Sequence, residues 1–322
     1  MKGEFFAIGL PQFKTACQLG MNPAIAFLVM ARGTQGDNST TAWSGHSVYN
    51  RTGISRRRAK AAVECLIKHG LTEVVRREPK PTYKLQKPDS DQELIWLPNT
   101  LIEGTGEEIP PVVKLREYGD LTLLEKFISL YHEHDLDGDG GLPRALARTE
   151  FKRTRIDGIG PFTLYGFQRG PSTANSIRLF SEFEGRVDER DNQGAWAILA
   201  PLEELGLLNK AVYMAESSDY ESELIYPVTD ATQDAIDHLW GWIHDREFHG
   251  CIKKDEDFDY FGIALSHVRN ACLVGCFRLH YRPHTSKTSR WWAEEKETEE
   301  AMIGLIRRTC SREPIYLCAH QG

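Results

Sequence analysis

The sequence lacks several features that would assign it to a well-marked class of protein. No apolar run in its 322 residues approaches the ~18 residues of a membrane-spanning helix, so no membrane association is expected. It also contains no glycine-rich phosphate loop, no nucleophile elbow and no cysteine pair with redox-motif spacing. We therefore predict neither an enzymatic activity nor a cofactor.

The cysteines do not form a regular framework either. There are seven, an odd number scattered over a long chain, and secreted disulfide scaffolds are instead short with evenly paired cysteines. This usage indicates reduced thiols and predicts a cytoplasmic protein. The cysteines are Cys17, Cys65, Cys251, Cys272, Cys276, Cys310 and Cys318.

Positive charge is scarce overall but concentrated in one part of the chain. The net charge is −7, which on its own argues against a nucleic-acid partner. Residues 1–90, however, contain fourteen Lys and Arg against six Asp and Glu, a balance of +8, so the rest of the chain carries −15. Salt screens charges more than ~8–10 Å apart, so a basic module can attract phosphate despite an acidic body.

Residues 44–86 contain the strongest structural pattern. Gly53 can take a left-handed conformation between two helices, and Ser55 can cap the second of them. In that second helix, apolar residues recur at helical spacing up to a terminating Gly70. The segments 71–76 and 82–86 then predict two paired strands around a proline-rich tip. The apolar positions are Ala59, Val63, Leu66 and Ile67.

These residues, and above all TGISRRRAKAAVECLIKHGL, resemble the second and third helices of the winged helix-turn-helix family. The resemblance covers about a quarter of the chain and implies a third helix in the major groove, with a wing on the DNA backbone. Matching by position implies third-helix contacts from Ser55, Arg56, Arg57, Arg58 and Lys60, and wing contacts from Arg76, Arg77, Lys80 and Lys84.

The whole chain is predicted to be an α+β protein in several parts. Residues 1–90 form the winged helix-turn-helix domain, with a polar loop at 33–44, and residues 91–116 form a linker. A helix at 195–205 followed by a hairpin over 211–228 predicts a second winged-helix-like unit spanning 117–230. Residues 231–322 form a C-terminal α+β region for docking or oligomerisation, and either this region or the second unit could support a homodimer.

Two groups of residues have side chains and spacings that could bind a metal ion. Asp135, Asp137 and Asp139 match the opening of a calcium loop, but its twelfth position is Leu146, so a solvated acidic turn is favoured. Four further residues are spaced by four, which on a helix could bind zinc but on a strand spreads them too far apart. Structural cysteines are therefore favoured and no metal is predicted. The four residues are Cys272, Cys276, His280 and His284.

Two functions of different classes remain open. The first is a sequence-specific DNA-binding protein, either a transcriptional regulator or a replication initiator of plasmid or phage type, with double-stranded DNA as its partner. It would read the major groove with the helix at 55–69 and the backbone with the wing at 72–86. The alternative is a protein-interaction module whose acidic body docks a basic partner or mimics nucleic acid.

Overall fold

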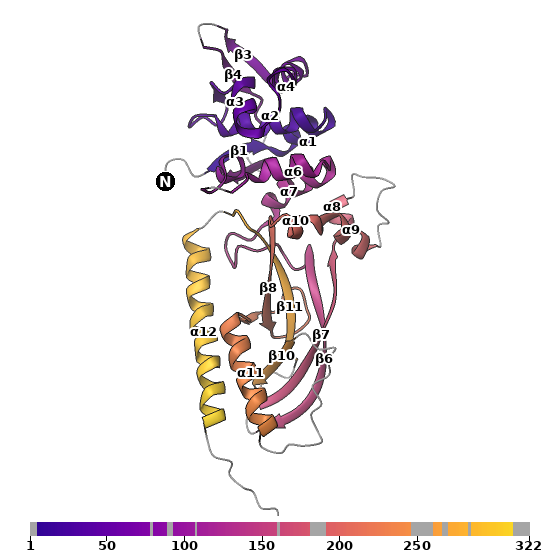
Figure 1. Ribbon diagram of the computed structural model, residues 1–322, viewed down its shortest axis with the longest axis vertical. Helices are drawn as coiled ribbons and strands as arrows, with labels where there is room; N and C mark the ends of the chain where they lie inside the picture. Colours follow the sequence, from indigo (N-terminus) through magenta and orange to yellow (C-terminus); the bar gives the residue numbers. More distant parts are fainter. Residues whose placement is uncertain are drawn as a thin grey trace, which may run out of the picture.

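The computed structural model is elongated, with the N-terminal helices at one end and a long sheet covered by helices towards the other (Figure 1). It describes residues 5–77, 80–88, 93–106, 108–159, 162–180, 191–245, 260–265, 270–282 and 285–311. The mixture of helices with antiparallel sheets confirms the predicted α+β class.

The N-terminal end is built around one fully surrounded helix. Nine consecutive residues of α2 (Met21–Arg32), from Pro23 to Ala31, are buried, so neighbouring elements must cover every side of it. They include α1 (Leu10–Gln18), α3 (Gly45–Thr52) and α4 (Arg56–Lys68). A three-stranded sheet in the order β2-β4-β3 completes the unit, with β2 at Thr40–Thr41, β3 at Thr72–Arg76 and β4 at Thr82–Leu85.

The segment predicted as a linker belongs instead to this N-terminal core, which corrects the linker at 91–116. Strand β5 (Leu94–Pro98) pairs antiparallel with β1 (Phe5–Gly9), placing Ile95 and Leu97 in the interior. The short helix α5 (Thr100–Glu103) and helix α6 (Pro111–Tyr118) bury Leu101, Ile102, Val112 and Leu115. Strand β1 would have unpaired backbone groups without β5, so the fold requires both segments.

The remaining described strands form one antiparallel sheet in the order β10-β7-β6-β11-β8-β9. Its strands are β6 (Ala147–Ile159), β7 (Phe162–Ala174), β8 (Leu208–Ala215), β9 (Leu224–Pro227), β10 (Tyr260–Leu265) and β11 (Cys272–Leu279). The predicted hairpin over 211–228 is present as β8 and β9. Because β11 lies between β6 and β8, residues on both sides of 230 share one sheet, which corrects the predicted boundary at 230.

Helices cover the ends and one side of this sheet. Helix α7 (Leu121–Glu133), capped by Asp120, packs towards the N-terminal core. The helix predicted over 195–205 breaks at Pro201 into α9 (Asn192–Leu199) and α10 (Pro201–Glu204), because proline has no N–H for the helical ladder. The others are α8 (Ser176–Phe180), α11 (Asp230–Asp245) and α12 (Ser286–Ser311), and the last two lie side by side (Figure 1).

One hydrophobic core joins the N-terminal helices to the adjoining end of the long sheet. The buried cluster that contains α2 extends through α7 to Phe277 and Leu279 in the C-terminal part of β11 and to Tyr281 just after it. Phe277 stacks on Trp196 of α9 with ring centroids 4.1 Å apart. A hydrogen bond from the Tyr281 hydroxyl to Glu108, 2.6 Å long, adds a polar connection. A second core lies between the sheet and helices α11 and α12.

Candidate nucleic-acid interface

The turn between α3 and α4 contains a left-handed glycine at position 53, as the sequence predicts. Ser44 begins α3 with a capping box, in which its side chain accepts from His46 N and its backbone N–H donates to the Ser47 hydroxyl at 3.3 Å. Gly53 ends α3 at a φ of 68°, a left-handed conformation in which a side chain would be strained. Helix α4 then starts after Ser55 and ends before Gly70, which has a φ of 75°.

Helices α3 and α4 approach each other most closely at Gly45. A Cβ atom added at Gly45 would lie 3.1 Å from the Lys60 Cα and 3.2 Å from the Lys60 N. These are backbone atoms of a helix, so they cannot turn aside as the end of a side chain could. Glycine at position 45 therefore sets the distance between the two helices.

We expect Gly45→Val to force α3 away from α4 and to lower the free energy of unfolding by about 1–3 kcal/mol, the usual cost of overpacking. Chemical denaturation measures this loss. The matched control is Gly36→Val, because a Cβ at Gly36 meets no atom within 4 Å and its φ is not positive. Equal stability of the two variants would contradict the close packing at Gly45.

The basic residues predicted on α4 are all exposed. Arg56 lies over the ring of Tyr49 on α3, 5.0 Å from its centroid, and Lys60 forms a 3.7 Å ion pair with Glu64. No described acidic residue forms an ion pair with Arg57 or Arg58. Ser55 occupies the N-cap position, but its hydroxyl makes no capping hydrogen bond, which corrects the predicted cap. The exposed residues are Ser55, Arg56, Arg57, Arg58 and Lys60.

The wing brings its four predicted cations to the surface beside this helix. Lys84 forms a 3.8 Å ion pair with Glu73 across the hairpin, in which both side chains are more than half exposed. The Arg76 Nε donates to the Lys80 carbonyl oxygen at 3.4 Å, which brings the two sides of the tip together. Glu78 and Pro79 at the tip lie outside the described residues. The exposed cations are Arg76, Arg77, Lys80 and Lys84.

The loop between α2 and α3 is held by specific contacts that the sequence analysis did not identify. The Asp37 carboxylate accepts hydrogen bonds from both Ser39 and Thr40. Burial raises its pKa, but these bonds outweigh that effect and hold the pKa well below its ordinary value. Asp followed by Ser and Thr is a known loop-forming pattern and was the available signal.

Arg51 is a cation of this region that is not free for a ligand. Its guanidinium lies 3.6 Å from the ring centroid of Trp43, and Arg32 lies 5.6 Å from the same ring. Burial lowers the pKa of Arg51, and the Glu103 carboxylate opposes that shift. A Cβ at Gly33 would lie 2.2 Å from the Trp43 ring, so glycine makes room for the indole. The contacts of Arg32 and Arg51 with Trp43 hold this residue, which precedes the N-cap of α3, in place.

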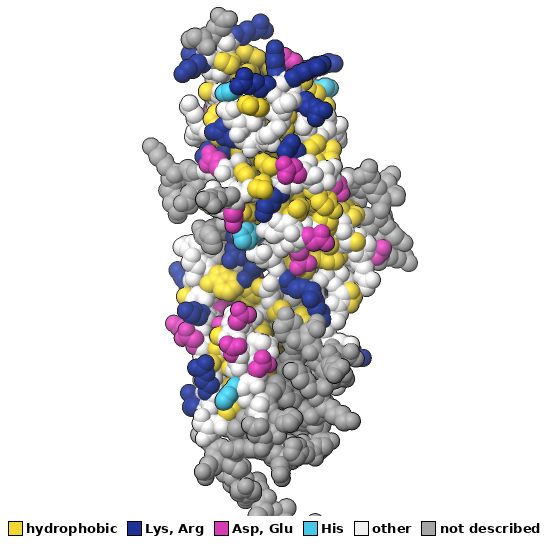
Figure 2. All heavy atoms as spheres, viewed as in Figure 1, with side chains coloured by type: hydrophobic (Ala, Val, Ile, Leu, Met, Phe, Trp, Pro, Cys, Tyr) yellow, Lys and Arg dark blue, Asp and Glu magenta, His cyan; other side chains and the backbone are white. Residues whose placement is uncertain are grey.

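Charge separates along the molecule as the sequence predicts. Lys and Arg side chains gather at the end that carries α3, α4 and the wing, whereas Asp and Glu side chains are frequent over the body (Figure 2). Among the described residues of α4 and the wing, the acidic residues are Glu64 and Glu73, and each pairs with an exposed lysine. Exposed pairs of this kind contribute at most about 1 kcal/mol, so a polyanion can displace them.

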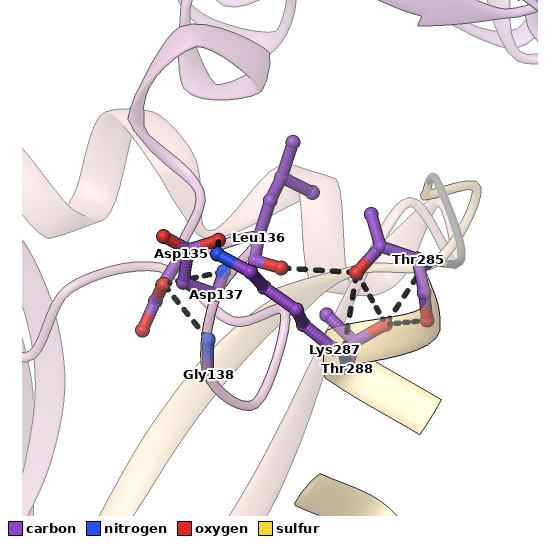
Figure 3. A network of polar contacts seen from close by, with 7 residues as sticks. All are labelled: Asp135, Leu136, Asp137, Gly138, Thr285, Lys287 and Thr288. Atoms are coloured by element: carbon purple, nitrogen blue, oxygen red, sulfur yellow. Dashed lines mark hydrogen bonds and ion pairs between the residues drawn. The ribbon is translucent and has the colours of Figure 1, made fainter. Parts of the chain in front are cut away.

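The acidic turn after α7 is a structural junction. Asp135 accepts hydrogen bonds from the backbone N–H groups of Asp137 and Gly138, and Asp137 pairs with Lys287 at 2.7 Å (Figure 3). The Thr285 hydroxyl donates to the Leu136 carbonyl, so the turn is attached to the start of α12 (Figure 3).

The third aspartate of this turn faces the sheet. Asp139 accepts two hydrogen bonds from the buried guanidinium of Arg278, at 2.8 and 3.2 Å. Burial lowers the pKa of Arg278 to about 10, while Asp139 opposes the shift. Each of the three aspartates therefore has a protein partner, which agrees with a structural turn.

The three described members of the equally spaced Cys and His set, Cys272, Cys276 and His280, do not form a metal site. Cys272 and Cys276 lie on β11, and a strand separates residues four apart by about 13 Å at ~3.3 Å per residue. Both thiols are buried, and burial raises the pKa of Cys276 to about 12. His280 follows the strand and bonds to Asn209 at 2.9 Å, whereas His284 lies outside the described residues. Across the described ranges, no group of His, Cys, Asp and Glu is placed to hold a metal ion.

No protein-family model and no curated protein matches this chain. Among solved structures it is similar to an IclR family transcriptional regulator from Brucella abortus, with 11% identity over 89% of this chain and 91% of that one. The TM-score is 0.17, too low to show a common fold, so the match carries no argument. None of the described helices combines the length and apolar character of a membrane span.

Proposed function

We propose that this protein is a DNA-binding regulator that docks α4 in the major groove and lays the wing on the adjacent backbone. The observation that supports this most directly is that Arg57 and Arg58 are exposed and form no ion pair with a described carboxylate. Both lie on α4, which is at one end of the molecule (Figure 1). An intramolecular role would require such a partner, whereas a phosphate or base edge can supply it from outside.

The proposed DNA contacts are of two kinds, phosphate contacts from the wing and base contacts from α4. The wing cations Arg76, Arg77, Lys80 and Lys84 are exposed on a hairpin that follows α4, where they can neutralise phosphates next to the groove. Helix α4 has thirteen residues and is the element whose diameter fits a major groove ~12 Å wide. The phosphate contacts supply affinity and register, and the helix supplies specificity.

The alternative, a protein-docking module, draws its support from the −15 balance of residues 91–322. A basic partner would then bind the body, and the arginines of α4 would have no function in binding. The first proposal predicts a complex with DNA that weakens as the salt concentration rises, whereas the second predicts no complex with DNA, so one measurement separates them. A predicted homodimer is compatible with either of them.

The test is electrophoretic retardation or fluorescence anisotropy of the full chain with random genomic duplexes, from 50 to 200 mM salt. If about four to six of the eight predicted cations neutralise phosphates, log K should fall with log salt with a slope of about −4 to −5. Selection from a random duplex library then identifies the preferred site. No binding to any duplex at 50 mM salt would refute the proposal and favour protein docking.

A further inference from the structure

The exposed face of α4 can be divided into an outer ridge and two flanks, and the arginine cluster extends over all three. Its buried residues, Ala59, Ala62, Val63 and Leu66, mark the side that faces the core. Successive residues of a helix are rotated by 100°, so residues four or seven positions apart lie on nearly the same side. The side of α4 opposite the core is defined by such a set. This outer ridge consists of Arg57, Ala61, Glu64 and Lys68, all exposed.

The other cations of α4 lie on the flanks of this ridge. Arg56 and Lys60 fall on one side, and Arg56 is held there by the ring of Tyr49. Arg58 falls on the opposite side. When a helix enters a groove, its flanks face the two phosphate walls and its ridge faces the base edges. The flank cations are therefore suited to phosphates, and the ridge residues to bases.

Glu64 is the unusual member of the ridge. A carboxylate that faces a polyanion lowers affinity unless it accepts a hydrogen bond from a base. Its described partner is Lys60, at 3.7 Å, with exposed fractions of 79% for the lysine and 63% for the glutamate. Such a pair is weak and can exchange partners on contact with DNA. In the major groove, the amino group that Glu and Asp accept from is the N4 group of cytosine.

We propose that α4 reads two base pairs through its ridge, with Arg57 bound to a guanine and Glu64 to the amino group of a cytosine. This inference rests on the proposed DNA-binding function. Seven residues at ~1.5 Å per residue separate Arg57 and Glu64 by about 10.5 Å, or about three base-pair steps of ~3.4 Å. The small side chain of Ala61 between them lets the helix lie deep in the groove.

The experiment compares the wild-type chain with Glu64→Gln by selection from a random duplex library and by titration of single-base variants of the selected site. For the wild type we expect a required guanine and a required cytosine about three steps apart. Glu64→Gln should reduce the preference for that cytosine by about 5- to 150-fold, the range for a good base contact. It should also strengthen binding to unrelated duplexes, because a negative charge is removed and Lys60 is released.

The matched control is Glu297→Gln, the same change at an exposed position of α12 in the body. It should leave both the selected site and the affinity unchanged. If the wild type binds DNA and Glu64→Gln keeps the full preference for cytosine, this assignment is overturned while the proposed function stands. If the wild type binds no duplex, the proposed function itself fails.

Discussion

Replacing Arg57 and Arg58 together with alanine is expected to weaken binding to the selected DNA site by at least about 100-fold. One of the two residues lies on the ridge of α4 and the other on its flank, so the pair removes a base contact and a phosphate contact. A good base contact contributes about 1–3 kcal/mol of discrimination, and the phosphate contact adds an electrostatic term. Fluorescence anisotropy at 100 mM salt measures the change.

The chain provides a close control for this experiment. Arg307 and Arg308 are also adjacent, exposed arginines, and they lie near the end of α12 in the body. Their double alanine variant has the same net charge as Arg57→Ala with Arg58→Ala. We expect it to retain nearly full affinity, since the effect depends on location. Equal losses of DNA affinity in the two variants would indicate a general effect of net charge and would contradict the assignment of α4 as the DNA-reading helix.

Phe277→Ala is expected to destabilise the whole molecule by about 3–5 kcal/mol, and both ends should unfold together. Phe277 is fully buried and stacks on Trp196, and truncating a buried aromatic side chain leaves a large cavity. Because Phe277 belongs to the same core as α2 and α4, the damage extends to the N-terminal end. Denaturation followed by hydrogen exchange reports α4 and the sheet separately.

The control is Tyr118→Ala, an aromatic truncation at a side chain that is 47% exposed, which should change stability by less than about 1 kcal/mol. A wild-type chain in which α4 unfolds well before the sheet would be inconsistent with the continuous core. So would a Phe277→Ala variant that loosens the sheet alone.

The elements predicted correctly are those specified by nearby residues. The spacing of Ala59, Val63 and Leu66 gives α4 an unambiguous buried face, and Gly53 and Gly70 mark the helix ends through their left-handed conformations. The same local signals predicted the two strands of the wing. Exposure of the α4 and wing cations also followed from the sequence, because apolar positions occupy the core side.

The errors concern contacts between residues far apart in the chain. Nothing near Leu94–Pro98 indicates that its partner is β1, almost ninety residues earlier, so local residues predict a linker there. In the same way all eight residues of β11 are buried, as in a central strand, but its own residues do not reveal that its neighbours are β6 and β8. Ridge and flank positions of α4 are periodic and could have been separated, but the consecutive arginines obscured that distinction.

The core that Phe277 and Leu279 of β11 share with the N-terminal helices also governs how two copies can sit on one duplex. Because the N-terminal end that carries α4 and the rest of the chain share that core, the two cannot rotate freely against each other. The direction in which the rest of each copy projects therefore follows from the orientation of its binding site. Copies bound to direct repeats about 10.5 base pairs apart would project their bodies from the same side of the DNA, whereas an additional half turn would place them on opposite sides. Spacing between sites would then decide whether neighbouring bodies can touch.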